Sequence, residues 1–234
     1  MTAAFHMVGA RPRAVSFGPP ITVTYAGTSQ STSAATTYNL PAISGGAADA
    51  NRWLIAFISF QTGTTLRDLV SVSIGGVAAE IIAELKNTTG SIGQICGIVA
   101  MALVPTGTTS VVSLTLTGSA SRAGAALFRT IKATKPKFTT VVSALDGSDP
   151  ASVSVPAVAG GACICFDTGF SSSAMAPVSW TGVTEILDIA YGASAAYFTA
   201  TLNAAAADTT YNAVATHSAN IATGQRVLIG AAVR

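Results

Sequence analysis

Apolar and hydroxyl side chains alternate along this chain wherever it is free of Gly and Pro. In the segment VVSLTL, Val112, Leu114 and Leu116 are separated by single Ser or Thr residues. A period of two predicts a β-strand with one buried face. No helical period extends beyond two or three turns. Similar alternation predicts strands at 21–26, 37–43, 70–74, 79–85, 138–145, 152–158 and 195–202.

The spacing of these segments favours one fold class. Turn-rich pieces such as KNTTG, PTGTT and DGSDP separate the predicted strands. About fifteen short strands with frequent turns are typical of antiparallel sheets packed face to face, not of alternating strands and helices. The sequence therefore predicts an all-β protein, an antiparallel β-sandwich of the jelly-roll or immunoglobulin-like type.

Three motifs occur twice, in the same order. VSIGGVAAEII and VSWTGVTEIL align Gly76 with Gly182, an offset of 182 − 76 = 106, and LPAISGGA and VPAVAGGA align Leu40 with Val155, an offset of 155 − 40 = 115. PTGTTSVVSLTLTGSA is followed by AADTTYNAVATHSAN, at an offset of 101. We predict an extended, Pro-rich arm at 1–20 and two related sandwich repeats at 21–134 and 135–234. In the alternative, each repeat supplies half the strands of one larger sandwich.

The segment RWLIAFISF is apolar on both of its predicted faces. A strand in an antiparallel sandwich normally has one face in water, so this strand needs a second cover. The cover is either the other repeat or another subunit. In the second case Trp53, Ile55 and Phe57 are the candidate subunit-contact residues of a homo-oligomer.

Composition excludes several classes of partner. Only 9% of the residues are charged and the net charge is +2, too little to indicate a nucleic-acid partner. The longest apolar runs are far shorter than the roughly 20 residues of a membrane-spanning helix, so no membrane insertion is expected. The N-terminus lacks the pattern of a secretory signal, and the three cysteines suit a reducing cytoplasm.

The sequence contains no motif that predicts catalysis. Phosphate-binding loops, zinc-protease helices, nucleophile elbows and dinucleotide fingerprints are all missing. The only histidines are His6 and His217, and His217 cannot pair with Ser218 along one strand because neighbours point to opposite faces. Glu185 and Asp188 are three positions apart along a probable strand, an odd number that predicts opposite faces and argues against a glycosidase pair. We expect no catalytic residues and no cofactor.

Metal ligands are equally scarce. Cys163 and Cys165 are predicted to share a strand face, but a zinc site would need two further ligands. Cys96 and His217 are the only soft candidates, and nothing in the sequence brings them together. The DGSDP segment is good turn chemistry, with too few oxygens for calcium. We therefore predict buried structural cysteines and no metal.

Taken together, the arm and the segments TTYNLPAISGGAADANRWLIAFISF, VSVSIGGVAAEII, ALVPTGTTSVVSLTLTG, VPAVAGGACICF and VSWTGVTEILD resemble β-sandwich virion proteins of tailed bacteriophages and related gene-transfer particles. The resemblance covers most of the chain from residue 21. It implies a non-enzymatic, oligomeric fibre, spike or decoration protein of the virion, made in the cytoplasm of the bacterial host. Its partners would be copies of itself and capsid, portal or tail proteins.

Two other functions stay open. In the first, the chain is an adhesin that binds a receptor or a host-surface glycan through tyrosines and loops of the second repeat, with Tyr191 and Tyr211 as candidate ligand-binding residues. Trp180 also lies in this repeat, but it aligns with Ile74 and is interpreted as a core residue. In the second, the chain is a hydrolase with an unrecognised carboxylate pair.

Overall fold

The computed structural model describes residues 19–88, 94–144, 149–170, 178–191, 196–217 and 226–234. These residues form antiparallel sheets and contain no helix, which confirms the predicted all-β class. Accordingly, none of the described residues belongs to a helix that could span a membrane. The predicted arm lies outside the described residues except for Pro19 and Pro20.

The first half of the chain, residues 21–134, forms two main sheets. The inner sheet has five strands, in the order β1 (Val23–Ser31), β11 (Arg122–Ile131), β4 (Arg52–Gln61), β8 (Ile95–Leu103) and β7 (Glu80–Asn87). The outer sheet has four, in the order β2 (Ala35–Asn39), β10 (Val112–Ala120), β5 (Leu69–Ile74) and β6 (Val77–Ala78). The short strands β3 (Ile43–Ser44) and β9 (Thr109–Ser110) form a separate ribbon.

The second half, residues 135–234, also forms an inner and an outer sheet. The inner sheet has the order β12 (Phe138–Ala144), β20 (Arg226–Val233), β14 (Gly161–Phe170), β17 (Ala196–Thr201) and β16 (Glu185–Tyr191), and β18 (Asn203–Ala205) also pairs with β14. The outer sheet consists of β13 (Ala151–Ala157), β19 (Thr209–His217) and β15 (Val178–Thr181). In both inner sheets, the first strand of that half lies at one edge and pairs with the last strand of that half. The remaining three strands follow in equivalent positions. Descent of the halves from one duplicated unit stays a prediction.

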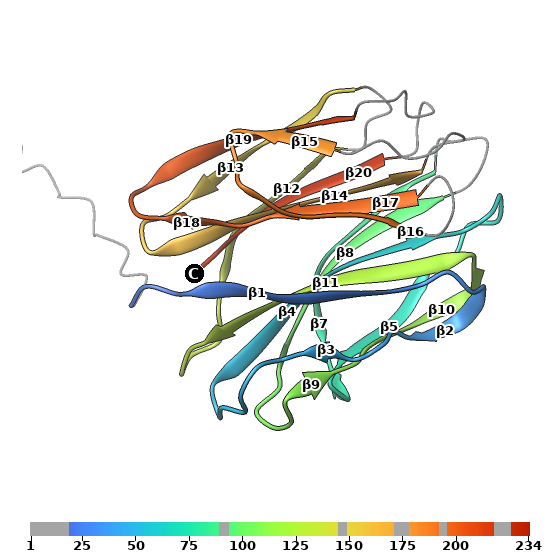
Figure 1. The fold of residues 1–234 in the computed structure, drawn as a ribbon, viewed down its shortest axis with the longest axis horizontal. Coiled ribbons are helices and arrows are strands. Elements are labelled where there is room, and N and C mark those ends of the chain that lie inside the picture. The colour runs from blue at the N-terminus through green and yellow to red at the C-terminus, as the bar shows by residue number, and fades with distance from the viewer. Residues whose placement is uncertain (1–18, 89–93, 145–148, 171–177, 192–195, 218–225) are drawn as a thin grey trace, which may run out of the picture.

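The four sheets stack as outer, inner, inner and outer layers (Figure 1). One apolar cluster fills each of the three interfaces: within the first half, between the two inner sheets, and within the second half. Among the described strands, no sheet mixes the two halves. Each half is thus a sandwich in its strand pairing, and the two sandwiches share an apolar core.

The middle interface explains the strand that is apolar on both faces. Ile55 and Phe57 have no exposed surface and lie in the cluster between the inner sheets, against Ile164 and Phe166. Trp53 is half-buried beside the same cluster. The second half of the same chain therefore covers β4, and the alternative of a second subunit at Ile55 and Phe57 is wrong because these side chains are not accessible.

The strand register divides the connections between the two ends of the molecule. Parallel stacking of β4 on β14 brings Ser59 beside Thr168, so the two inner sheets end together. Both described chain ends, Pro19 and Arg234, lie at the opposite end, as Figure 1 shows. The connections that share one end, called here the connection end, are 32–34, 62–68, 88–94, 121, 145–150, 171–177, 192–195 and 218–225.

Candidate functional site

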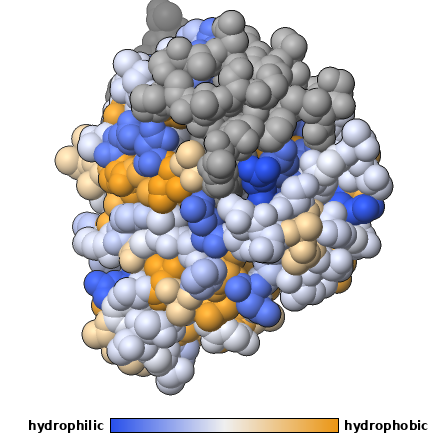
Figure 2. All heavy atoms as spheres, turned by 45° about the vertical axis from the view of Figure 1, so that its right-hand side comes forward, coloured by the Kyte–Doolittle hydropathy of each residue, from blue (hydrophilic) through white to orange (hydrophobic). Residues whose placement is uncertain are grey.

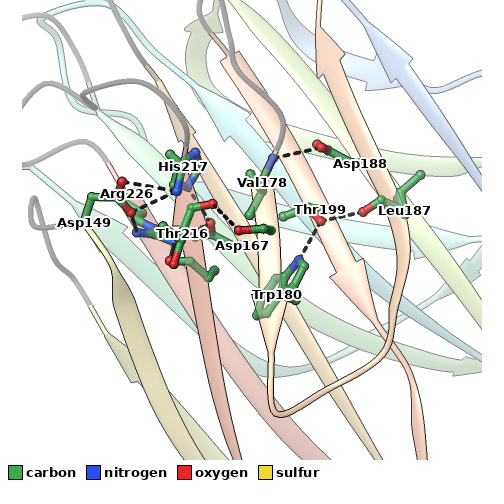
Figure 3. A network of polar contacts seen from close by, with 12 residues as sticks. Asp149, Asp167, Val178, Trp180, Leu187, Asp188, Thr199, Thr216, His217 and Arg226 are labelled. Atoms are coloured by element: carbon green, nitrogen blue, oxygen red, sulfur yellow. Dashed lines mark hydrogen bonds and ion pairs between the residues drawn. The ribbon is translucent and has the colours of Figure 1, made fainter.

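A cluster of four ionisable residues, three of them buried, lies at the connection end of the second half (Figure 3). Asp167 comes from β14, and Arg226 is the first residue of β20. His217 is the last residue of β19, and Asp149 stands just before β13. We call these four residues the ionic cluster. Apolar strands on both sides place it between the inner and outer sheets of this half.

Arg226 holds the cluster together through hydrogen bonds to Asp167 and Ala215 and an ion pair with Asp149. Its Nε and Nη2 donate to Asp167 Oδ1 and Oδ2, both at 2.9 Å, which is the paired geometry that a guanidinium and a carboxylate prefer. Nη2 also donates to the carbonyl oxygen of Ala215 at 2.8 Å. Nη1 lies 3.6 Å from Asp149 Oδ1. The side chains of Arg226 and Asp167 are fully buried, so each charge depends on these contacts for its solvation.

His217 closes the cluster on the side of the outer sheet. Its Nε2 lies 3.1 Å from Asp167 Oδ2, and its side chain is 2% exposed. Its backbone N–H donates to both oxygens of Asp149, at 3.0 and 3.2 Å. Asp149 therefore connects the segment before β13 to the end of β19.

Asp167 is ionised in this environment. Burial by itself raises the pKa of a carboxyl group, but the charge of Arg226 and the hydrogen bonds from His217 and Arg226 outweigh burial and hold the pKa of Asp167 below its ordinary value. The cluster is thus a desolvated ion pair with an imidazole against one of its oxygens.

The first half has no such cluster at the matching positions. Counting from the starts of β4 and β14, Asp167 matches Ile58, because 167 − 161 = 58 − 52. Strand pairing matches Arg226 with Ala123, and the offset of 101 between the threonine motifs matches His217 with Leu116. Ile58, Ala123 and Leu116 are all buried core residues. The fold therefore accommodates an apolar core where the second half has charges.

A strip of polar side chains extends from the cluster toward β16. Trp180 Nε1 donates to Thr199 Oγ1 at 2.9 Å, and Thr199 Oγ1 donates to the carbonyl oxygen of Leu187. Asp188 Oδ2 accepts the backbone N–H of Val178 at 2.9 Å. These bonds fix β15 over the edge of the inner sheet (Figure 3). Trp180 is half-buried against the core, as its alignment with Ile74 predicted.

The expected separation of Glu185 and Asp188 is wrong. A register shift lies between Glu185 and Leu187, so Glu185 pairs with Thr201 and Asp188 pairs with Thr199. Since Thr199 and Thr201 are two residues apart, both carboxylates lie on the same face of the sheet. Burial raises the pKa of both groups, and the charge of Asp188 further raises the pKa of Glu185.

The two candidate tyrosines do not lie together. Tyr211 Oη donates to the carbonyl oxygen of Ala204, which pairs with the start of β14. The backbone of Tyr191 pairs with Ala196, level with Phe170 at the end of β14, and its side chain lies outside the described residues. The register separates these levels by about 26 Å, at roughly 3.3 Å per residue. One binding site that uses both tyrosines does not fit this register.

The cysteines are buried and free, as predicted. Cys163 Sγ and Cys165 Sγ are 3.9 Å apart, on the face of β14 that the outer sheet covers. Their mutual hydrogen bond and burial raise the pKa of Cys163, and burial raises the pKa of Cys96. Within the described ranges, no three His, Cys, Asp or Glu residues are grouped to hold a metal ion.

Sequence reasoning missed three buried charges. Asp167 and Arg226 form the ionic cluster, and Arg52 donates to carbonyl oxygens of Gly46, Val104 and Thr106 at 2.6–2.8 Å. The available signal was a lone charge inside or beside an otherwise apolar strand, as in GACICFDTGF and RVLIGAAV.

Comparison with known proteins gives no relative. No protein-family model matches the chain, and no curated protein or solved structure matches it.

Proposed function

We propose that the chain is a non-enzymatic structural component on the outside of a phage-like particle. It attaches through the end at which Pro19 and Arg234 lie and displays the connection end outward. The observation that carries this proposal is that Pro19 and Arg234 lie at the same end of the molecule, opposite the connection end. An N-terminal arm that enters at the attachment end can reach a neighbouring virion protein.

The packing of the two halves supports a structural role. Three apolar clusters run through the four layers, and the middle one joins both halves over their inner sheets. A shared apolar interface of this kind restrains relative domain motion. Figure 2 turns the connection end toward the viewer, and over the described surface its apolar areas are broken up by polar ones. Such a surface stays soluble while it is displayed.

The test uses labelled particles. The buried native cysteines do not compete for a thiol label, so single cysteines at exposed positions of the two ends, Thr65→Cys and Thr108→Cys, report orientation. Gold particles on Thr65→Cys should lie at a larger radius than those on Thr108→Cys in micrographs of particles. Removal of residues 1–20 should abolish incorporation. If the full chain is monomeric and never sediments with particles, the proposal is wrong.

A second candidate function is recognition of a host-surface glycan at the connection end. Immunoglobulin variable domains likewise carry their binding loops at one end of paired sandwiches. Because Tyr191 lies at the connection end and Tyr211 does not, glycan-array binding should fall on Tyr191→Ala and persist on Tyr211→Ala. Equal loss in both variants, or no glycan binding at all, would remove this candidate.

A further inference from the structure

Three of the four residues of the ionic cluster, all except Asp167, lie where a connection meets a strand. Asp149 precedes β13, His217 ends β19 and Arg226 begins β20. Each of these three residues lies at, or within two residues of, the end of a strand at the connection end. We call these positions the roots of the connections. The backbone N–H of His217 bonds to the Asp149 carboxylate, which joins two of these roots directly.

A residue of the first half joins the same cluster. Asn87, the last residue of β7, is buried, and its Nδ2 donates to the carbonyl oxygen of Arg226 at 3.0 Å. The start of β20 is therefore held by Asp167 and Asp149 through its side chain and by Asn87 through its backbone. The cluster thus links roots of connections from both halves.

Stability of the sandwich does not require these charges. The matching positions of the first half hold Ile58, Leu116 and Ala123 in an apolar core. Buried ion pairs are often replaced by apolar residues with no loss of stability, because desolvation offsets their attraction. A buried ion pair has one advantage over apolar residues, which is that a bidentate guanidinium fixes its partners in one orientation.

We propose that the ionic cluster is a latch that fixes the roots of the connections between β12 and β13 and between β19 and β20, and that it does not serve to stabilise the second sandwich. Ionisable groups outside the cluster also lie near it. Asp149, Asp167 and Arg226 belong to it, Asp188 on β16 interacts electrostatically with both Asp167 and His217, and the Cys165 thiol lies on the same face of β14.

The test replaces three residues of the ionic cluster with the apolar residues found at the matching positions of the first half. In the full chain, Asp167→Ile, His217→Leu and Arg226→Ala are combined, and hydrogen exchange is followed by mass spectrometry. Peptides that cover 149–153 and 226–230 should exchange on the order of tenfold faster, while peptides from β4 and β11 should not change. The thermal midpoint should stay level or rise. A variant that fails to fold, or that melts more than about 10 °C lower, would show that the cluster is a stabiliser and overturn the proposal.

A single substitution, Asp149→Ala, provides an independent test. Asp149→Ala removes the link between the roots without a change in the buried ion pair of Asp167 and Arg226. Exchange in 149–153 and 226–230 should rise, with the thermal midpoint within a few degrees of the wild type. Asp208→Asn is the matched control, because Asp208 also accepts a backbone N–H, that of Ala159 at 2.7 Å, far from the cluster. Unchanged exchange in Asp149→Ala would also overturn the latch.

Discussion

The rings of Phe57 and Phe166 lie 5.7 Å apart between the two inner sheets, and the two residues hold the same position in β4 and β14, because 57 − 52 = 166 − 161. The next inward-facing pair, Ser59 and Thr168, also matches and is joined by a hydrogen bond of 2.7 Å. Contacts between equivalent residues occur beside a twofold axis. The edge strands agree, since β1 contacts β16 while β7 contacts β12. The halves therefore pack like the two subunits of a symmetric dimer.

Truncation of either phenylalanine tests this interface. Phe57→Ala and Phe166→Ala should each lower the free energy of unfolding by about 3–5 kcal/mol, since both side chains are fully buried. The double variant should lose less than the sum, by about 0.5–1.5 kcal/mol, because the rings contact each other. Urea unfolding followed by tryptophan fluorescence measures the free energy of unfolding of the two single variants and the double variant. Additive losses would mean that the two rings do not interact in solution.

Much of the fold could be predicted from the sequence because strands leave a local signal. Val112, Leu114 and Leu116 alternate with hydroxyl residues and all face the core. The aligned glycines Gly76 and Gly182 both adopt positive φ, 79° and 78°, which L-residues with a side chain disfavour. The cover on β4 was left open, because an apolar face does not identify what packs on it.

The candidate site was less predictable, for two physical reasons. The sheet face on which Glu185 lies depends on a bulge in β16. One extra residue in a strand moves the side chains that follow it to the opposite face from the one that simple alternation predicts. Asp167 and Arg226 are 59 residues apart, and only the pairing of β14 with β20 brings them together. Neither fact has a local sequence signal.

Substitutions of Arg52 test how much a buried charged side chain contributes to the stability of the first half. Its side chain is fully buried and donates to carbonyl oxygens of residues 45, 46, 47, 104 and 106. Arg52→Met should lower the free energy of unfolding by about 3 kcal/mol or more, because several buried acceptors lose their donor. Arg52→Lys should recover only part of the loss, since an ammonium has three donors and no planar fork. Full stability of the methionine variant in urea unfolding would contradict this role.

The cysteines should be inert in the native protein. All three are buried, and the raised pKa of Cys96 and of Cys163 further disfavours the reactive thiolate. A chromogenic disulfide reagent at pH 8 should detect no thiol before unfolding and three thiols in guanidinium chloride. Rapid reaction of even one native thiol would show that a core opens.

Asp188 should be destabilising in its charged form. Burial raises its folded pKa, so the folded state binds a proton more tightly than the unfolded state, and stability falls as the pH rises above the ordinary value of 3.8. Asp188→Asn keeps an oxygen that can accept the N–H of Val178 and removes the charge. Its free energy of unfolding at pH 7 should equal or exceed that of the wild type. A clear loss in urea unfolding would mean that the carboxylate charge stabilises the strip.

Asp167 should show the opposite pH dependence. Its folded pKa is held below 3.8 by Arg226 and His217 against the effect of burial, so its contribution to stability is complete above that value and is lost as the pH falls through the folded pKa. Asp167→Asn should lower the free energy of unfolding at pH 7 by about 3–5 kcal/mol, because Arg226 is left buried without its carboxylate. Urea unfolding between pH 2 and 7 should then show the two proteins converging in stability at the acid end. Asp208→Asn serves as the control and should run parallel to the wild type. A constant gap between wild type and Asp167→Asn down to pH 2 would mean that Asp167 does not titrate as an ionised partner of Arg226.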